Sequence, residues 1–234
     1  MNHELTEQHG KENEHGRHVI IGFAGIRPKP KYTFMKIQII GEGSFGSFLN
    51  ELLGPIFEID KSADSVILAV PISAYDSLAS GHRDRHLINV CSVQKPSTEM
   101  ALRYTPNITS IHPLFGARTP TEKRNSILTR EVAPDSPFAE SEREFLETFS
   151  TVSTIKRTDP SGVPFTPDSH DQLMAKTHVA AVVAARQMKV FVDRASDIPD
   201  EYIPNSFRLM RDFVNTLDDM PHGTMESILA NPYF

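Results

Sequence analysis

The feature that most constrains the fold of this chain is a glycine-rich turn between an apolar strand and an apolar helix. Residues 35–40 have the pattern of a buried strand, G-E-G-S-F-G follows at once, and residues 48–53 have the pattern of a helix. The glycines permit a tight turn and a close backbone approach, and the first N–H groups of the helix can bind a pyrophosphate. The sequence therefore predicts a dinucleotide site, with a purely structural turn as the alternative. Its residues would be Gly41, Gly43, Ser44, Phe45 and Gly46.

The segment after this helix contains two strand-like runs that lie close together in the sequence. Residues 56–60 end in Asp60, an acid at the position that would bind a ribose hydroxyl, and residues 65–70 form a second buried run. Neighbouring parallel strands need a crossover of about a dozen residues or more, and only residues 61–64 separate these runs. We therefore expect either an irregular or edge segment at 56–60 or a shortened nucleotide-binding half.

Two further apolar runs lead into side chains suited to catalysis. Residues 87–88 precede N-V-C-S-V, which contains Ser92, and residues 108–111 precede H-P-L-F-G, which begins at His112. In open α/β sheets ligands bind outside the carboxyl ends of the strands, so this hydroxyl and this imidazole can converge on one ligand. Imidazole changes its protonation near neutral pH, which suits His112 to act as a general base. The alternative is a hydrogen-bonded loop histidine.

The last third of the chain has helical patterns. A boundary rich in proline spans residues 158–167, and beyond it we expect helices at 168–193, capped by Asp168 or Ser169, at 206–217 and at 221–229. Before the boundary, a helix at 141–149 should expose Glu142, Glu144 and Glu147. We predict an α/β fold in three parts: a mobile tail and linker at 1–33, a shortened Rossmann-type, mostly parallel sheet at 34–158, and a small all-helical domain at 165–234.

Composition and charge exclude several partners. The net charge of -6 comes without a run of Lys or Arg, so nucleic acid is not expected. No stretch approaches the ~20 apolar residues of a membrane span. Cys91 is the single cysteine, and the polar start lacks the apolar core of a secretory signal, which together predict a cytoplasmic protein. His170 and His178 are eight residues apart, a poor metal spacing, so we expect no metal site.

Six segments in order carry a resemblance to a known family: G-E-G-S-F-G, A-D-S-V-I-L-A-V-P, V-C-S-V, H-P-L-F-G, H-D-Q-L-M-A and S-F-R-L-M. Together they make residues 35–232 resemble the prephenate/arogenate dehydrogenases of tyrosine biosynthesis. The resemblance implies a Rossmann-type domain followed by a helical domain that pairs with its twin in a homodimer. It also implies oxidative decarboxylation of prephenate or arogenate with NAD or NADP.

The resemblance also implies roles for individual residues. His112 would accept the proton of the ring hydroxyl as hydride leaves the same carbon, and Ser92 would hydrogen-bond that hydroxyl or the imidazole. Arg208 would hold a substrate carboxylate and His170 would support the pocket. The family usually has Lys directly after S-V, whereas here Gln94 stands there and Lys95 follows as the substrate-binding candidate. Val70 and Pro71, from A-V-P, would join the glycines at the cofactor.

Two other functions stay open from the sequence. The chain can be a non-catalytic descendant of that family that binds a cyclohexadienyl or aromatic acid, or a reductase of the wider dinucleotide-binding group acting on another small acid. The shortened stretch between Gly46 and Val66 distinguishes the non-catalytic protein from the dehydrogenase, because binding of the nicotinamide cofactor fails if this stretch does not cover the adenosine.

Overall fold

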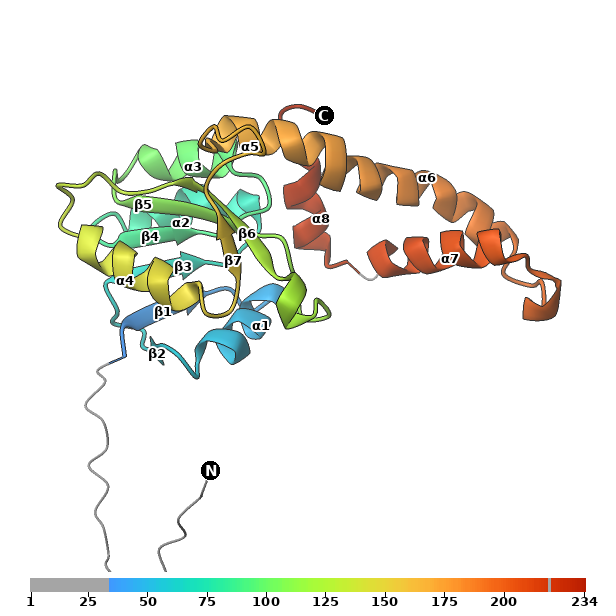
Figure 1. Cartoon of the computed structure of the whole chain (residues 1–234), viewed down its shortest axis with the longest axis horizontal. Helices are drawn as coiled ribbons and strands as arrows, with labels where there is room; N and C mark the ends of the chain where they lie inside the picture. The colour runs from blue at the N-terminus through green and yellow to red at the C-terminus, as the bar shows by residue number, and fades with distance from the viewer. Residues whose placement is uncertain (1–33, 219) are drawn as a thin grey trace, which may run out of the picture. The chain divides into compact units, whose positions relative to one another are not determined.

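The structure is a computed structural model and describes residues 34–218 and 220–234 (Figure 1). The predicted tail, residues 1–33, lies outside the described residues. Residues 34–234 form one compact unit. None of the helices within the described ranges has the length and apolar content that a membrane crossing requires.

A seven-stranded sheet in the order β2-β1-β3-β4-β5-β6-β7 organises the fold. Strands β1 to β5 run parallel to one another, β6 runs antiparallel to β5, and β7 runs parallel to β6. The predicted α/β class with a mostly parallel Rossmann-type sheet is therefore confirmed. The strands are β1 (Lys36–Ile40), β2 (Glu58–Ile59), β3 (Ser65–Leu68), β4 (His86–Asn89), β5 (Ile108–Pro113), β6 (Asn125–Arg130) and β7 (Thr154–Lys156).

Helices cover both faces of this sheet because neighbouring residues of each buried strand point to opposite sides. On one face, Ile67 and Ile88 pack with α1 and α4, and on the other Val66 and Leu87 pack with α2 and α3 (Figure 1). The helices are α1 (Ser44–Leu53), α2 (Tyr75–Gly81), α3 (Lys95–Leu102), α4 (Ala139–Phe149), α5 (Pro167–Met174), α6 (Ala180–Arg194), α7 (Asn205–Asp218) and α8 (His222–Leu229). Short 3-10 turns lie at Ile72–Ala74, Thr121–Lys123 and Asp200–Tyr202.

The two strand-like runs that seemed too close in sequence both join the sheet, on opposite sides of β1. Ile59 of β2 and Ser65 of β3 both pair with Ile37. The connection therefore crosses only the width of β1, about 10 Å, which lies within the ~17 Å reach of five residues. The long crossover is not needed, because the two runs are not neighbours in the sheet, and the predicted edge segment is confirmed, since β2 is a two-residue edge strand.

The helix expected at 168–193 is interrupted. It consists of α5, a π-helical turn at Ala175–Val179 and α6. The predicted caps are wrong: Thr166 is the N-cap, and its side chain accepts a hydrogen bond from the backbone N–H of Ser169. Pro167 follows at the first helical position, where a missing N–H costs nothing.

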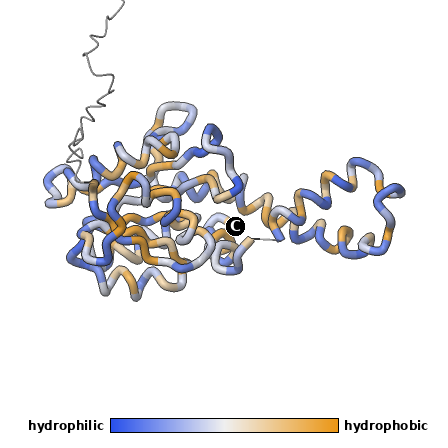
Figure 2. Tube along the Cα trace, turned by 90° about the horizontal axis from the view of Figure 1, so that it is seen from below, coloured by the Kyte–Doolittle hydropathy of each residue, from blue (hydrophilic) through white to orange (hydrophobic). Residues whose placement is uncertain are grey.

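Helices α6 and α7 form a hairpin that leads away from the sheet, and α8 returns to it (Figure 1). Polar and apolar residues alternate along this hairpin, whereas apolar residues gather in the sheet (Figure 2). Four large apolar side chains of α6 and α7 are exposed, namely Val190, Phe191, Leu209 and Phe213. An exposed apolar face of this kind is typical of an interaction surface.

A buried polar network at the amino end of β4 and β5 corrects one prediction for α4. Glu142 is only 6% exposed, not solvated. It accepts hydrogen bonds from the Thr109 hydroxyl and the Val132 backbone N–H. The imidazole of His86 joins the network through Nε2, 2.7 Å from Thr109 Oγ1, and through Nδ1, 3.0 Å from Ser65 Oγ.

Burial of His86 predicts a pH-dependent stability. Because burial disfavours the imidazolium, the pKa of His86 falls from 6.5 to about 4. As the pH falls, the unfolded chain is protonated first, so the folded state loses stability between these two values. We expect His86 to lower the free energy of unfolding by about 3 kcal/mol between pH 7 and pH 4.

Chemical denaturation at both pH values, in the natural protein and in His86→Gln, measures this contribution. The raised pKa of Glu142 has the opposite effect on stability as the pH falls. This effect is common to both proteins, so the difference between them reports His86 alone. An identical pH dependence in the two proteins would contradict the prediction.

Candidate active site

The glycine turn follows β1 at the carboxyl edge of the sheet, and two of its glycines are required by packing. Gly41 has a φ of 136°, and a Cβ there would lie 2.1 Å from the carbonyl oxygen of Ala69. A Cβ on Gly46 would lie 2.0 Å from the carbonyl oxygen of Gly41. Gly43 is different, because a Cβ there would have no atom within 4 Å among its surroundings.

The beginning of α1 is open in the way that a phosphate group requires. Gly43 is its N-cap and provides no side-chain hydrogen bond, and both Gly43 and Ser44 are exposed. Unpaired N–H groups and the positive end of the helix dipole favour an anion at such a terminus. Val70 and Pro71 follow β3 at the same edge of the sheet, because β1 and β3 are parallel. The residues present therefore fit the pyrophosphate of a dinucleotide.

Asp60 directly follows the carboxyl end of β2, and neighbouring side chains hold its carboxylate. Its carboxylate accepts a hydrogen bond of 2.8 Å from Lys36 Nζ at the beginning of β1, and two more from the backbone and hydroxyl of Ser62. Lys36 and then Ser62 hold the pKa of Asp60 well below its usual range. Because β2 runs parallel to β1, Asp60 follows its strand on the same side of the sheet as the glycine turn, and its ribose contact stays a prediction.

A chain of three side chains lies at the carboxyl end of β5. His112 is on β5 and 3% exposed, and its Nδ1 lies 2.9 Å from Nε2 of His170 on α5. His170 Nδ1 lies in turn 2.8 Å from Asp171 Oδ1. A register shift between β5 and β6 falls at Ser110 and Ile111, directly before His112. Such a bulge redirects the side chains next to it.

The π-helical turn brings a second imidazole to His112. The His178 ring lies 6.3 Å from the His112 ring, centroid to centroid, with an angle of 15° between the planes. Residues eight apart on an α-helix differ in direction by about 80°, because each residue turns about 100°. The wider π turn removes most of that difference, so His170 and His178 both face His112. The described residues contain no group of His, Cys, Asp or Glu arranged to hold a metal ion.

The surroundings keep His112 neutral. Burial is the main cause that lowers its pKa well below 6.5, and the nearby His170 and His178 lower it further. Burial likewise lowers the pKa of His178, with a smaller effect of His170. A neutral imidazole is the form that can accept a proton.

Asp171 is a site residue that the sequence reasoning missed. Besides its contact with His170, its Oδ1 accepts the backbone N–H of Gln94 and its Oδ2 that of Lys95, both at 2.8 Å. These are the first N–H groups of α3, a helix that was not predicted. Asn231 Nδ2 donates to the Asp171 carbonyl at 2.9 Å. The adjacent H-D pair was the available signal.

The other predicted site residues occupy different places. Ser92 is half-buried in the loop after β4, at the same edge of the sheet as His112. Lys95 Nζ lies 2.6 Å from Asp168 Oδ1 and contacts Tyr233, and these two residues, Asp168 foremost, raise the pKa of Lys95. Arg208 lies on α7 and donates to the Asp200 carbonyl.

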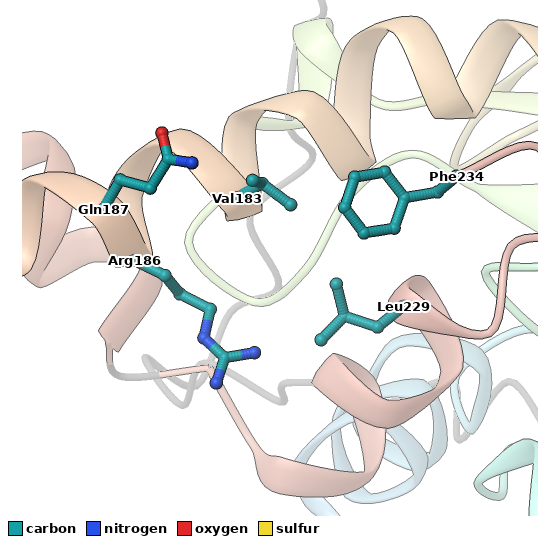
Figure 3. A pocket seen from close by; sticks show the side chains of 5 residues that line it. All are labelled: Val183, Arg186, Gln187, Leu229 and Phe234. Atoms are coloured by element: carbon teal, nitrogen blue, oxygen red, sulfur yellow. The ribbon is translucent and has the colours of Figure 1, made fainter.

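A separate hollow of about 380 Å³ lies between α6 and the C-terminal residues (Figure 3). Val183, Arg186 and Gln187 line it from α6, and Leu229 and Phe234 line it from the other side. None of the three imidazoles contributes to its walls. The candidate active site is therefore located by its chemistry at the sheet edge and not by this hollow.

No family model and no curated protein matches this chain. Solved structures do match. A candidate prephenate dehydrogenase from Corynebacterium glutamicum aligns with a TM-score of 0.60 and 15% identity over 82% of this chain and 73% of the other. Prephenate dehydrogenase from Aquifex aeolicus, solved with hydroxyphenyl propionate and NAD+, aligns with a TM-score of 0.56 and 14% identity over 86% and 84%.

The fold is that of a prephenate dehydrogenase. Arogenate dehydrogenase from Synechocystis aligns at a TM-score of 0.47 and 18% identity over 82% of each chain. In the described residues this fold consists of a mostly parallel sheet followed by a helical region.

Proposed function

We propose that this protein is a cytoplasmic, homodimeric dehydrogenase of tyrosine biosynthesis that oxidatively decarboxylates prephenate or arogenate with NAD or NADP. The observation that carries the proposal is a buried, neutral His112 at the sheet edge where the open glycine turn also lies. The prephenate dehydrogenase fold supports the same reaction.

The parallel strands account for the convergence of these groups. Because β1, β3, β4 and β5 run in the same direction, their carboxyl ends meet at one edge. The glycine turn, Val70, Ser92 and His112 follow or end these four strands in that order. In the proposed complex, Gly43 and Ser44 hold the pyrophosphate, and the substrate hydroxyl lies between Ser92 and His112.

In the proposed reaction, a dinucleotide held at the glycine turn would supply the hydride acceptor. His112 accepts the proton of the ring hydroxyl as hydride leaves the same carbon, which avoids a cationic product. Loss of carbon dioxide is then driven by formation of the aromatic ring, so the protein mainly supplies a base and positions the reactants. Ser92 hydrogen-bonds the hydroxyl and Lys95 lies nearby at the start of α3 as a cation for a substrate carboxylate.

Arg208 can take part only through a second subunit. The α6 helix has 15 residues, so its ends lie about 22 Å apart. His178 lies just before the first turn of α6 and beside His112. Arg208 bonds to Asp200, which lies beyond the other end of α6. Arg208 Nε is also buried without a hydrogen-bond partner within the described residues. We infer that the exposed apolar face of α6 and α7 pairs with its twin and brings Arg208 to the partner's His112.

Mixing two inactive variants tests this arrangement. In a heterodimer of His112→Asn and Arg208→Ala, one site carries both changes and the other carries neither. If the subunits exchange freely, a 1:1 mixture should regain about a quarter of the natural activity, because half of the dimers each contain one intact site of two. If Arg208 acts within its own chain, no site is intact and the mixture stays inactive.

The function itself is tested by following reduced-nicotinamide formation with prephenate and with arogenate, each with NAD and with NADP. Turnover that disappears in His112→Asn supports the dehydrogenase and identifies the substrate and cofactor. A folded protein that turns over none of the four pairs contradicts it.

The pairing of Asp60 with Lys36 favours a second candidate, a non-catalytic protein that binds a cyclohexadienyl or aromatic acid. β2 is reduced to two residues, and the acid expected to bind the adenosine half of a dinucleotide, Asp60, is already paired with Lys36. Calorimetric titration separates the candidates: the dehydrogenase binds NAD or NADP as well as the acid, whereas this alternative binds the acid alone.

A further inference from the structure

The Asp171 carboxylate determines where the protons of the neighbouring imidazoles lie. It is fully buried and surrounded by three nitrogen atoms: the backbone nitrogens of Gln94 and Lys95, and Nδ1 of His170. An ionised carboxylate only accepts hydrogen bonds. The third contact is therefore a donation, and the hydrogen must be on His170 Nδ1.

The position of the hydrogen on His112 follows from the position of the hydrogen on His170. A neutral imidazole with hydrogen on Nδ1 has a lone pair on Nε2. His170 Nε2 lies 2.9 Å from His112 Nδ1, and one hydrogen must lie between these two nitrogens. Because His170 Nε2 is the acceptor, the hydrogen is on His112 Nδ1. The unprotonated nitrogen of His112 is then Nε2.

We propose that Asp171 and His170 are positioning residues that hold His112 in its Nδ1–H tautomer and thereby make Nε2 the base of the reaction. This inference rests on the proposed function, in which His112 accepts the proton of the ring hydroxyl. The competing assignment is a doubly protonated His170 that donates from Nε2. It would put the hydrogen of His112 on Nε2, leave no base, and place a buried cation beside His112 and His178.

The same contacts support the charge that forms on reaction. When Nε2 takes the hydroxyl proton, His112 becomes an imidazolium whose Nδ1–H still points at His170. The Nδ1–H of His170 points at the Asp171 carboxylate, so the negative charge lies two hydrogen bonds from the new positive charge. A buried carboxylate that orients a base in this way has a large effect on turnover in other enzymes.

Asp171 also fixes the loop that carries Ser92. Its carboxylate binds the first N–H groups of α3, and the Gln94 side chain donates to the Cys91 carbonyl at 2.6 Å. Substituting Asp171 would disturb both this loop and the imidazoles. His170 is the better position for a test, because substituting its side chain leaves the contacts between Asp171 and α3 in place.

Nitrogen-15 NMR of the full chain labelled at histidine reads the tautomers directly, independently of turnover. Signals of His112 are assigned by their loss in His112→Asn. We expect Nδ1 of His112 to be protonated and Nε2 unprotonated in the natural protein. In His170→Phe the acceptor is gone and this preference should be lost, whereas in His170→Gln the amide oxygen can still accept from Nδ1. Asp168→Asn changes a carboxylate on the same helix without touching either imidazole and should leave the tautomer unchanged.

Kinetics provide the second readout. With the substrate and cofactor of the natural protein, His170→Phe should lower kcat by roughly 10- to 10³-fold with little change in KM, and His170→Gln should recover part of it. A protonated Nε2 in the natural protein, or an unchanged tautomer in His170→Phe, would overturn the inference. The expected tautomers in a protein without turnover would instead contradict the proposed function and leave the positioning role standing.

Discussion

Replacement of His112 by Asn should lower kcat for the dehydrogenase reaction by roughly 10²- to 10⁴-fold, the usual loss when a general base is removed. Asn is close to His in shape and polarity, so the 3% exposed position stays filled. His86→Gln is the matched control: it removes another buried histidine, at the opposite end of the sheet, and should retain kcat. A stopped or continuous assay that follows the absorbance of the reduced nicotinamide measures kcat of both variants. Equal losses in the two variants would mean that His112 acts only through stability.

The pH dependence of the natural enzyme gives the same assignment a second test. Burial, His170 and His178 lower the pKa of His112 well below 6.5. The neutral base is the active form, and it is lost only when the pH falls through this depressed pKa. We expect the acid limb of kcat/KM to lie below pH 6.5 and to be governed by one group. An acid limb at or above that value would contradict a buried, neutral His112.

The second large effect is expected at Gly41. With a φ of 136° and a Cβ only 2.1 Å from the Ala69 carbonyl oxygen, an alanine clashes with backbone that cannot move aside. Gly41→Ala should lower the free energy of unfolding by more than about 3 kcal/mol. Gly46→Ala should behave similarly, because its Cβ would meet the Gly41 carbonyl oxygen. Thermal and chemical denaturation measure these losses.

Gly43→Ala is the control that separates folding from cofactor binding. A Cβ at Gly43 has open space within 4 Å, so stability should stay within about 1 kcal/mol of the natural protein. The added methyl group lies at the N-cap of α1, where the proposed pyrophosphate approaches the backbone. We expect the Kd for NAD or NADP to rise at least tenfold. An unchanged Kd would mean that the dinucleotide, if bound, does not lie on this turn.

Local patterns in the sequence predicted much of this fold. The run of residues 35–40, the glycines after it and the helix predicted at 48–53 lie within a few residues of one another, so alternation, turn chemistry and helix periodicity describe them. The helix itself begins earlier, at Ser44. The strand ends that carry Ser92 and His112 were recognisable for the same reason. Parallel strands then bring such ends to one edge, whatever the details of packing.

Tertiary structure decided the features that depend on residues far apart in the chain. The sequence by itself predicted extended runs at 56–60 and 65–70, within which the strands Glu58–Ile59 and Ser65–Leu68 lie. Only hydrogen bonding to both sides of Ile37 decided that they flank one strand. Glu142 is buried because Thr109 and Val132 satisfy its carboxylate. Asp171 caps α3 from 77 positions away in sequence and contacts His170, which reaches His112. A periodicity records which side of an element is apolar, whereas the partner of a buried polar group is set only when distant segments pack together.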